Sequence, residues 1–175
     1  MRHYTACCWD FATGAFDVFF YLHGAGPGRD WAETLKLSDS VRILGPRGGV
    51  PARHASKHIV IGDETSLGHA RALQDYAPAG VPVEGIVVCL PETAPFPAAV
   101  GLEAITALLV PDRALAPAAV LDWIARRGAD PGARYHVTGN QTIVMAAVRA
   151  LVKSLGVPRE AIHQRIHWAA GKQGL

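Results

Sequence analysis

The sequence predicts an α/β protein in which a small antiparallel β lobe precedes a doubly wound lobe built on a parallel sheet. Two apolar runs near the N-terminus are separated by the turn-forming segment "DFATG". After residue 57, short β-branched runs alternate with longer amphipathic segments, a pattern typical of parallel sheets covered by helices. The loop "GPRGGVPARHASKH" separates the two patterns, so we place the boundary near residues 49–56, between lobes at 1–52 and 53–175.

Composition narrows the class of protein. Half of the 175 residues are hydrophobic and 18% are charged, which favours a packed core over disorder. Lys and Arg number 17 against 15 Asp and Glu, a balance that argues against a nucleic-acid binder. Cys7, Cys8 and Cys89 form no Cys-x-x-Cys motif or disulfide framework, which indicates a reducing cytoplasm. We find no signal peptide and no apolar run of about 20 residues, and we expect a soluble protein without a membrane span.

The first lobe is expected to begin with a hairpin. Its strands are predicted from His3 to Trp9 and from Ala15 to His23. The loop "GAGPGRD" leads into a short helix, "WAETLKL", and a further strand is predicted over Val41–Leu44.

The second lobe is expected to contain about five strands and three long helices. The strands are predicted at "HIVIG", "VEGIVVCL", "AITALLV", "RYHVTG" and "AIHQRIHWAAG". The helices are predicted at "DETSLGHARALQDYA", "APAAVLDWIARRG" and "NQTIVMAAVRALVKSLG". Open sheets of this kind bind ligands beyond the carboxyl ends of their strands, at helix N-termini.

Two strand-to-helix turns carry side chains suited to a nucleotide. In "IGDETSLG", Asp63, Thr65 and Ser66 stand where a helix begins, and in "VTGNQTIV", Gly139 precedes Asn140. Backbone N–H groups at such turns bind phosphate or ribose. Ordinary helix capping is the alternative, because the Gly-x-Gly-x-x-Gly fingerprint is absent.

The N-terminal segment offers a similar chemistry. Arg2 and Tyr4 share one face of a strand, where a guanidinium binds phosphate and a tyrosine ring lies along a flat heterocycle. In "YLHGAGPGRDW", three glycines allow close backbone approach, and the following helix presents N–H groups to a pyrophosphate. A frayed terminus and a solvated glycine-rich loop are the alternatives.

Together, these segments resemble the siderophore-interacting proteins, flavin-dependent ferric-siderophore reductases of the ferredoxin–NADP reductase superfamily. The resemblance covers almost the whole chain, in order, through "RHYT", "YLHGAGPGRDWAETLKLSDSVRILGPRGG", "IGDETSLGHARAL", "TGN" and "HWAAGK". It implies a partial FAD-binding β-barrel over 1–52 and an NAD(P)-binding lobe over 53–175. FAD and either NADPH or NADH are the implied cofactors, and a ferric siderophore is the implied partner.

The resemblance also implies which residues bind the cofactors. The Arg-x-Tyr-Thr group would hold the flavin diphosphate and ring, and the segment from His23 to Trp31 would cradle the rest of FAD. The turn after "HIVIG" would face the nicotinamide nucleotide, with a C-terminal tryptophan beside both. The predicted cofactor-binding residues are Arg2, Tyr4, Thr5, His23, Gly26, Pro27, Gly28, Trp31, Asp63, Glu64, Thr65, Ser66, Gly139 and Trp168.

A basic cluster spans the predicted boundary loop. Arg47, Arg53 and Lys57 are its predicted substrate-binding members, which would attract an anionic ferric chelate or a cofactor phosphate. A solvated basic loop is the alternative.

Neither a metal site nor a catalytic acid or base is predicted. His163 and His167 are four residues apart, but they lack a helical context and an acidic third ligand. In the implied mechanism a nicotinamide passes hydride to the flavin, which passes electrons singly to Fe(III), so the cofactor carries the chemistry.

The sequence departs from the family pattern before Arg2, where family members carry further barrel strands. A half barrel has open strand edges, and a partner or a second copy, as in a homodimer, would close it. Gly68 stands where the family usually has proline. Two other functions are kept as alternatives: a non-catalytic nucleotide-binding or interaction module, and a general NAD(P)H:flavin reductase.

Overall fold

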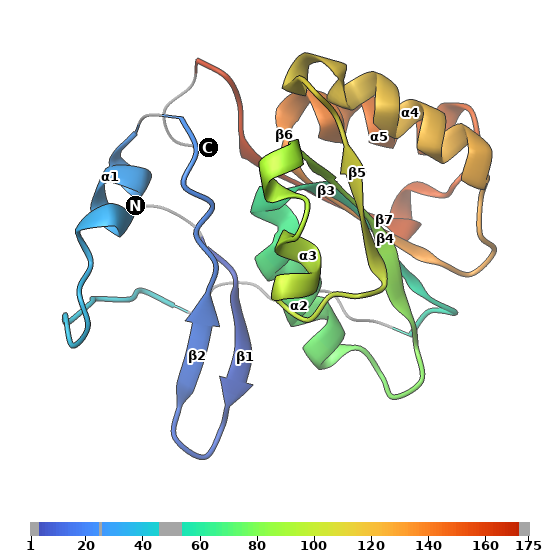
Figure 1. The fold of residues 1–175 in the computed structure, drawn as a ribbon. Coiled ribbons are helices and arrows are strands. Elements are labelled where there is room, and N and C mark those ends of the chain that lie inside the picture. Colours follow the sequence, from blue (N-terminus) through green and yellow to red (C-terminus); the bar gives the residue numbers. More distant parts are fainter. Residues whose placement is uncertain (1–3, 25, 46–53, 172–175) are drawn as a thin grey trace.

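The computed structural model describes residues 4–24, 26–45 and 54–171 (Figure 1). It has the mixed α/β fold that the sequence predicts, with a two-stranded antiparallel sheet and a five-stranded parallel sheet. Arg2, Arg47, Arg53 and most of the predicted boundary loop lie outside the described residues. In the described part of the chain, the helices are too short or too polar to cross a membrane.

Residues 4–45, called the β lobe below, contain the predicted hairpin. Strands β1 (Ala6–Asp10) and β2 (Ala15–Val18) pair antiparallel, with a bulge where Cys8 adopts a φ of 52°. Helix α1 (Pro27–Thr34) begins four residues before the predicted start, because proline at the first helical position favours initiation there. The strand predicted over Val41–Leu44 is wrong: this segment pairs with no described strand, and Ile43 and Leu44 are 64% and 67% exposed.

Residues 54–171 form the α/β lobe, and its five predicted strands and three long helices are confirmed. The strands are β3 (His58–Asp63), β4 (Val83–Cys89), β5 (Ile105–Leu109), β6 (Arg134–Asn140) and β7 (Ile162–Trp168). The helices are α2 (Leu67–Tyr76), α3 (Phe96–Ala99), α4 (Ala116–Arg127) and α5 (Gln141–Lys153). Short 3-10 turns cover η1 (Glu64–Ser66), η2 (Pro91–Thr93), η3 (Arg113–Leu115) and η4 (Arg159–Ala161).

Helices cover both faces of the parallel sheet. Figure 1 shows α4 and α5 on one face and α2 with the short α3 on the other. All six residues of the central strand β3 are buried, as expected for a parallel strand covered on both sides. Ile59 and Ile61 pack with the α4–α5 core, whereas Val60 packs with the α2 core, since successive side chains alternate between faces.

The strand order β5-β4-β3-β6-β7 places a switch point between β3 and β6. The chain runs outward from β3 through β4 to β5, then returns to β6 on the other side of β3. The turns after β3 and β6 therefore meet at the carboxyl edge of the sheet. Ligands of open α/β sheets bind at this position.

Three buried histidines, called the histidine chain below, link the sheet to α2. The Nδ1 atom of His58 lies 3.1 Å from Nε2 of His136, and Nδ1 of His136 lies 3.1 Å from Nε2 of His69. The exposed fractions of His58, His136 and His69 are 0%, 0% and 5%. The ring of His163 stacks on that of His69, with centroids 5.3 Å apart. The interface between α2 and the sheet therefore contains a polar contact through His69, beside the apolar contacts that Leu67 and its neighbours form.

The close pairing of β3 and β4 predicts the effect of replacing Gly85. This residue has a φ of +139°, and a Cβ added to it would lie 2.0 Å from the carbonyl oxygen of Val60. Replacing Gly85 with alanine should lower the free energy of unfolding by about 2 to 3 kcal/mol, measured by urea titration. The control is Gly80→Ala, at a φ of +81° with open space around it, which should cost about 1 kcal/mol. Equal effects of the two substitutions would contradict the prediction.

Candidate functional site at the joint between the lobes

The two lobes meet along residues that the sequence singled out. A Cβ added to Gly68, in the first turn of α2, would lie 3.5 Å from the carbonyl oxygen of Thr5. The His23 ring contacts the Trp168 ring, with centroids 4.6 Å apart. Of the predicted cofactor-binding residues of the β lobe, Thr5 therefore lies against the start of α2 and His23 against the end of β7.

Tyr4 lies against the start of α1. A Cβ added to Gly28 would be 2.7 Å from the Tyr4 hydroxyl oxygen, so the tyrosine lies close to the backbone of the first helical turn. The aromatic side chains of Tyr4 and Trp31 remain 46% and 40% exposed. Gly26 caps α1 without a side-chain hydrogen bond, which leaves backbone N–H groups open at the helix start. Exposed rings beside an uncapped helix N-terminus fit a planar, phosphate-bearing group such as a flavin nucleotide.

The carboxylate of Asp63 occupies the centre of the two predicted turns. It is fully buried and accepts hydrogen bonds from the backbone N–H groups of Thr65 (3.0 Å) and Asn140 (2.8 Å). It also accepts one from the indole Nε1 of Trp168, at 2.9 Å. The turns meet as expected, but these two N–H groups bind Asp63. Gly139 is required for the same reason, since a Cβ there would lie 2.7 Å from an Asp63 oxygen.

The buried Glu64 forms an ion pair with the partly buried Arg113, a residue that sequence reasoning missed. Both terminal nitrogens of Arg113 donate to the Glu64 carboxylate at 2.9 Å, and Thr93 donates its hydroxyl at 2.7 Å. Burial tends to raise the pKa of Glu64, but these hydrogen bonds hold it below its ordinary value. Arg113 also donates to the Tyr21 hydroxyl of the β lobe. A single arginine after a strand carries no sequence signal, because its partner depends on the strand order.

Other polar side chains at the edge are also held in place. The Nδ1 atom of His167 lies 3.1 Å from the Thr65 carbonyl oxygen, and burial lowers the pKa of His167. Burial also lowers the pKa of His23, which favours the neutral ring. The Ser66 hydroxyl is buried without a hydrogen-bond partner. In the part of the chain that the structure describes, three or more His, Cys, Asp or Glu side chains nowhere converge as metal ligands.

Lys57 lies away from the other predicted site residues. It precedes β3, at the edge of the sheet opposite Asp63, and its Nζ atom lies 3.3 Å from Glu84 and 3.5 Å from Asp130. The structure therefore does not bring Lys57 together with the joint. The other predicted substrate-binding residues, Arg47 and Arg53, lie outside the described residues.

Comparison with known proteins gives a family match for the first part of the chain. Residues 1–50 match the family model of the siderophore-interacting FAD-binding domain. No curated protein matches the chain.

Three solved structures share its fold. The siderophore-interacting protein SipS from Aeromonas hydrophila has a TM-score of 0.77 at 22% identity, over 98% of this chain and 69% of its own. A siderophore utilization protein from T. fusca has a TM-score of 0.73 at 24% identity, over 99% and 68%. The siderophore-interacting protein from Acinetobacter baumannii has a TM-score of 0.70 at 13% identity, over 98% and 71%. The chain thus has the fold of siderophore-interacting proteins, and its first 50 residues match the FAD-binding domain of that family, in agreement with the resemblance found in the sequence.

Proposed function

We propose that this chain is a flavoprotein reductase that binds FAD at the joint between its lobes and reduces ferric iron held in a siderophore with electrons from NADH or NADPH. One observation carries the proposal. Thr5 lies against the start of α2 and His23 against Trp168, at the carboxyl edge of the sheet, and the same lobe carries the exposed Tyr4 beside the uncapped start of α1. The match of residues 1–50 to a siderophore-interacting FAD-binding domain supports a flavin-linked role in siderophore utilisation.

The residues of the joint would bind and orient the cofactors. Tyr4 and Thr5 would flank the flavin ring, and the N–H groups at the start of α1 would bind its phosphates. Trp168, fixed by its hydrogen bond to Asp63, would exclude water from the joint. When bound, FAD would accept a hydride and release single electrons, chemistry that needs no acid or base from the protein.

The proposal keeps the predicted division into an FAD-binding lobe at 1–52 and a nucleotide-binding lobe at 53–175. Arg2 is proposed to hold the flavin diphosphate, and Arg47 and Arg53 to attract the ferric chelate. Because Asp63 and Glu64 are bonded to protein groups, we assign them to shaping the turn rather than to direct ligand contact. Closure of the β lobe by a second copy stays a prediction.

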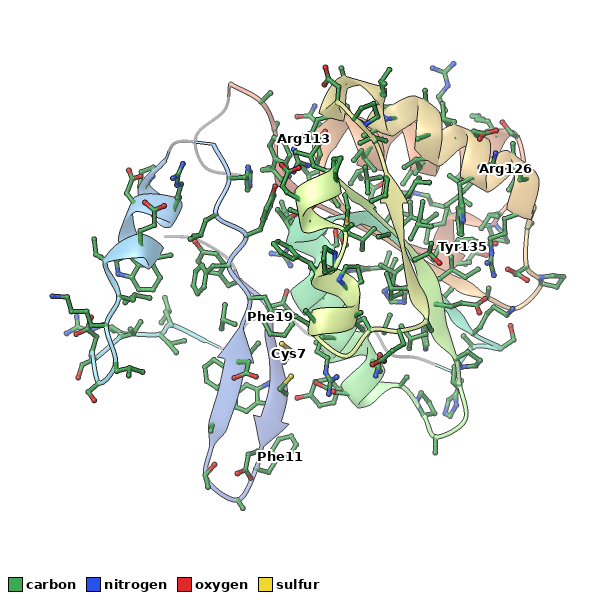
Figure 2. The ribbon with its side chains drawn as sticks, viewed as in Figure 1. Cys7, Phe11, Phe19, Arg113, Arg126 and Tyr135 are labelled. Carbon is green, nitrogen blue, oxygen red and sulfur yellow. The ribbon has the colours of Figure 1, made fainter. Side chains whose placement is uncertain are left out.

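Titration of the purified chain with FAD, followed by quenching of flavin fluorescence, tests the proposal. Tyr4→Ala should weaken FAD binding by about fivefold to a hundredfold, because it removes about 1 to 3 kcal/mol of ring stacking. The matched control is Phe11→Ala in the hairpin turn, where an aromatic ring that is 79% exposed lies far from the joint (Figure 2). A wild-type chain that ignores FAD, or a Tyr4→Ala variant with unchanged affinity, would contradict the proposal.

A non-catalytic module is the second candidate. It is favoured by the β lobe, where Cys7 is the one fully buried hydrophobic side chain among the described residues, 4–24 and 26–45. Failure to bind FAD together with retained binding of a nicotinamide nucleotide would support this candidate. Faster reduction of free flavin than of ferric chelates would instead favour a general flavin reductase.

A further inference from the structure

The side chain of Arg113 joins the two lobes. One of its terminal nitrogens donates to the hydroxyl of Tyr21, which follows β2 in the β lobe. The same guanidinium pairs with both carboxylate oxygens of Glu64, in the turn after β3. Figure 2 shows Arg113 on the side of the α/β lobe that faces the β lobe. Three separate segments of the chain therefore converge on one guanidinium group.

The orientation of this guanidinium is fixed from the α/β side. The Glu64 side chain is 0% exposed and is held by the Thr93 hydroxyl as well as by Arg113. A bidentate pair with a carboxylate fixes the plane of the guanidinium, so the remaining donor direction is fixed too. Tyr21 consequently meets a rigid partner, unlike a flexible lysine at the surface.

A second contact runs parallel to the first. The ring of Tyr21 stacks on that of His23 with centroids 5.0 Å apart, and His23 in turn contacts Trp168. Trp168 is bonded to Asp63, the residue that precedes Glu64. Both contacts thus connect the segment after β2 to the end of β3, where the FAD-binding and nucleotide-binding residues would face each other.

We propose that the Tyr21–Arg113–Glu64 contact is a latch that fixes the angle between the lobes and so the alignment of the flavin and nicotinamide rings. This inference rests on the proposed function, because alignment matters only if a hydride passes between two rings. Tyr21 and Arg113 are positioning residues that touch neither ring. Displacement of reacting atoms by about 1 Å lowers a rate by up to about a hundredfold, so the latch acts on kcat rather than on binding.

The test is Tyr21→Phe in the full-length chain loaded with FAD. This variant keeps the ring, its stack on His23 and the Arg113–Glu64 pair, and it removes only the hydroxyl. We expect FAD affinity within about twofold of wild type and a kcat for NADH- or NADPH-driven reduction of a ferric siderophore at least about tenfold lower, with KM within about threefold. Amide hydrogen exchange over residues 15–24 should become faster while exchange in β3 and β6 stays unchanged.

Two further variants sharpen the test. Tyr76→Phe removes the same atom from an exposed tyrosine at the end of α2 and should change neither kcat nor exchange. Arg113→Lys keeps a cation beside Glu64, but one ammonium group does not reproduce the planar fork, so it should show the kinetic defect of Tyr21→Phe.

Each outcome decides between the proposals. Unchanged kcat and unchanged exchange in Tyr21→Phe would overturn the latch and leave the proposed function standing. Loss of FAD binding in that variant would also overturn it, because the hydroxyl would then act on the cofactor directly. A wild-type chain that binds FAD but oxidises neither nucleotide would overturn both proposals.

Discussion

Acidification from pH 7 to pH 5 should lower the free energy of unfolding by about 4 kcal/mol through His69 and His136 alone, at about 2 kcal/mol for each imidazole. Burial, together with neighbouring basic groups, lowers the pKa of His69 from 6.5 to about 3 and that of His136 to about 2. The groups that add to the effect of burial are all cations when protonated: His58, His163, His167, Arg134 and Arg165. An imidazolium in the histidine chain would therefore be both desolvated and repelled.

The sign of the effect follows from proton binding. Between pH 6.5 and about 3 the unfolded chain protonates these two histidines, whereas the folded chain keeps them neutral. The stabilisation is thus fully present above pH 6.5 and is lost as the pH falls through this window. Protonation of the histidine chain would loosen the packing of α2, whose first turn lies against Thr5, so the proposed flavin binding should weaken over the same range.

Urea titrations at pH 7 and pH 5 measure this effect. The difference between the two free energies of unfolding should be about 2 kcal/mol smaller in His136→Leu than in wild type, whatever the stability of the variant at pH 7. His54→Gln, which removes an exposed imidazole, serves as the control and should keep the wild-type difference. The same difference in His136→Leu and wild type would contradict a neutral histidine chain.

Replacing Arg113 with methionine should cost about 3 to 5 kcal/mol of folding free energy, the second large effect that we expect. The substitution leaves the Glu64 carboxylate 0% exposed and without its cation. The pKa of Glu64, now held below its ordinary value, should then rise, because burial is the largest opposing influence on it. Thermal or urea unfolding at pH 7 gives the magnitude.

Two variants separate the effect of the unpaired Glu64 carboxylate from a general loss of stability. Arg126→Met breaks an exposed pair with Asp122, whose side chains are 66% and 60% exposed, and should cost less than about 0.5 kcal/mol (Figure 2). The double variant Arg113→Met with Glu64→Gln should be more stable than Arg113→Met alone, since the buried charge is gone. A double variant that is less stable than the single one would argue against an uncompensated carboxylate as the cause.

The sequence predicted the α/β lobe well because its signals are local. Runs such as "HIVIG" and "VEGIVVCL" are β-branched and bounded by glycine or proline, and the structure places β3 and β4 on them. Val41–Leu44 has the same local character but finds no pairing partner among the described residues, so its propensity produces no strand. Helix α1 shows the opposite case. It begins at Pro27, before the segment that the apolar pattern predicts, because proline at the first helical position favours initiation.

The site was predicted only as far as topology allowed. The rule for open sheets correctly brought the turns after β3 and β6 together. The rule did not predict the hydrogen bond between Asp63 and the Asn140 N–H group, because that bond depends on which carboxylate lies close to free N–H groups. Arg113 and the histidine chain depend on pairs 49 and 78 residues apart in sequence, which no local pattern encodes.

The near absence of a core in residues 4–45 has a consequence for biosynthesis. A two-stranded ribbon is marginal by itself, and Cys7 is the one fully buried hydrophobic side chain that the structure describes in this segment. The ribosome nevertheless releases this segment before the α/β lobe. We therefore expect it to stay unstructured until α2 and Arg113 have emerged and the parallel sheet has formed the surface on which it packs. The part proposed to bind the cofactor is thus synthesised before the lobe on which it becomes structured.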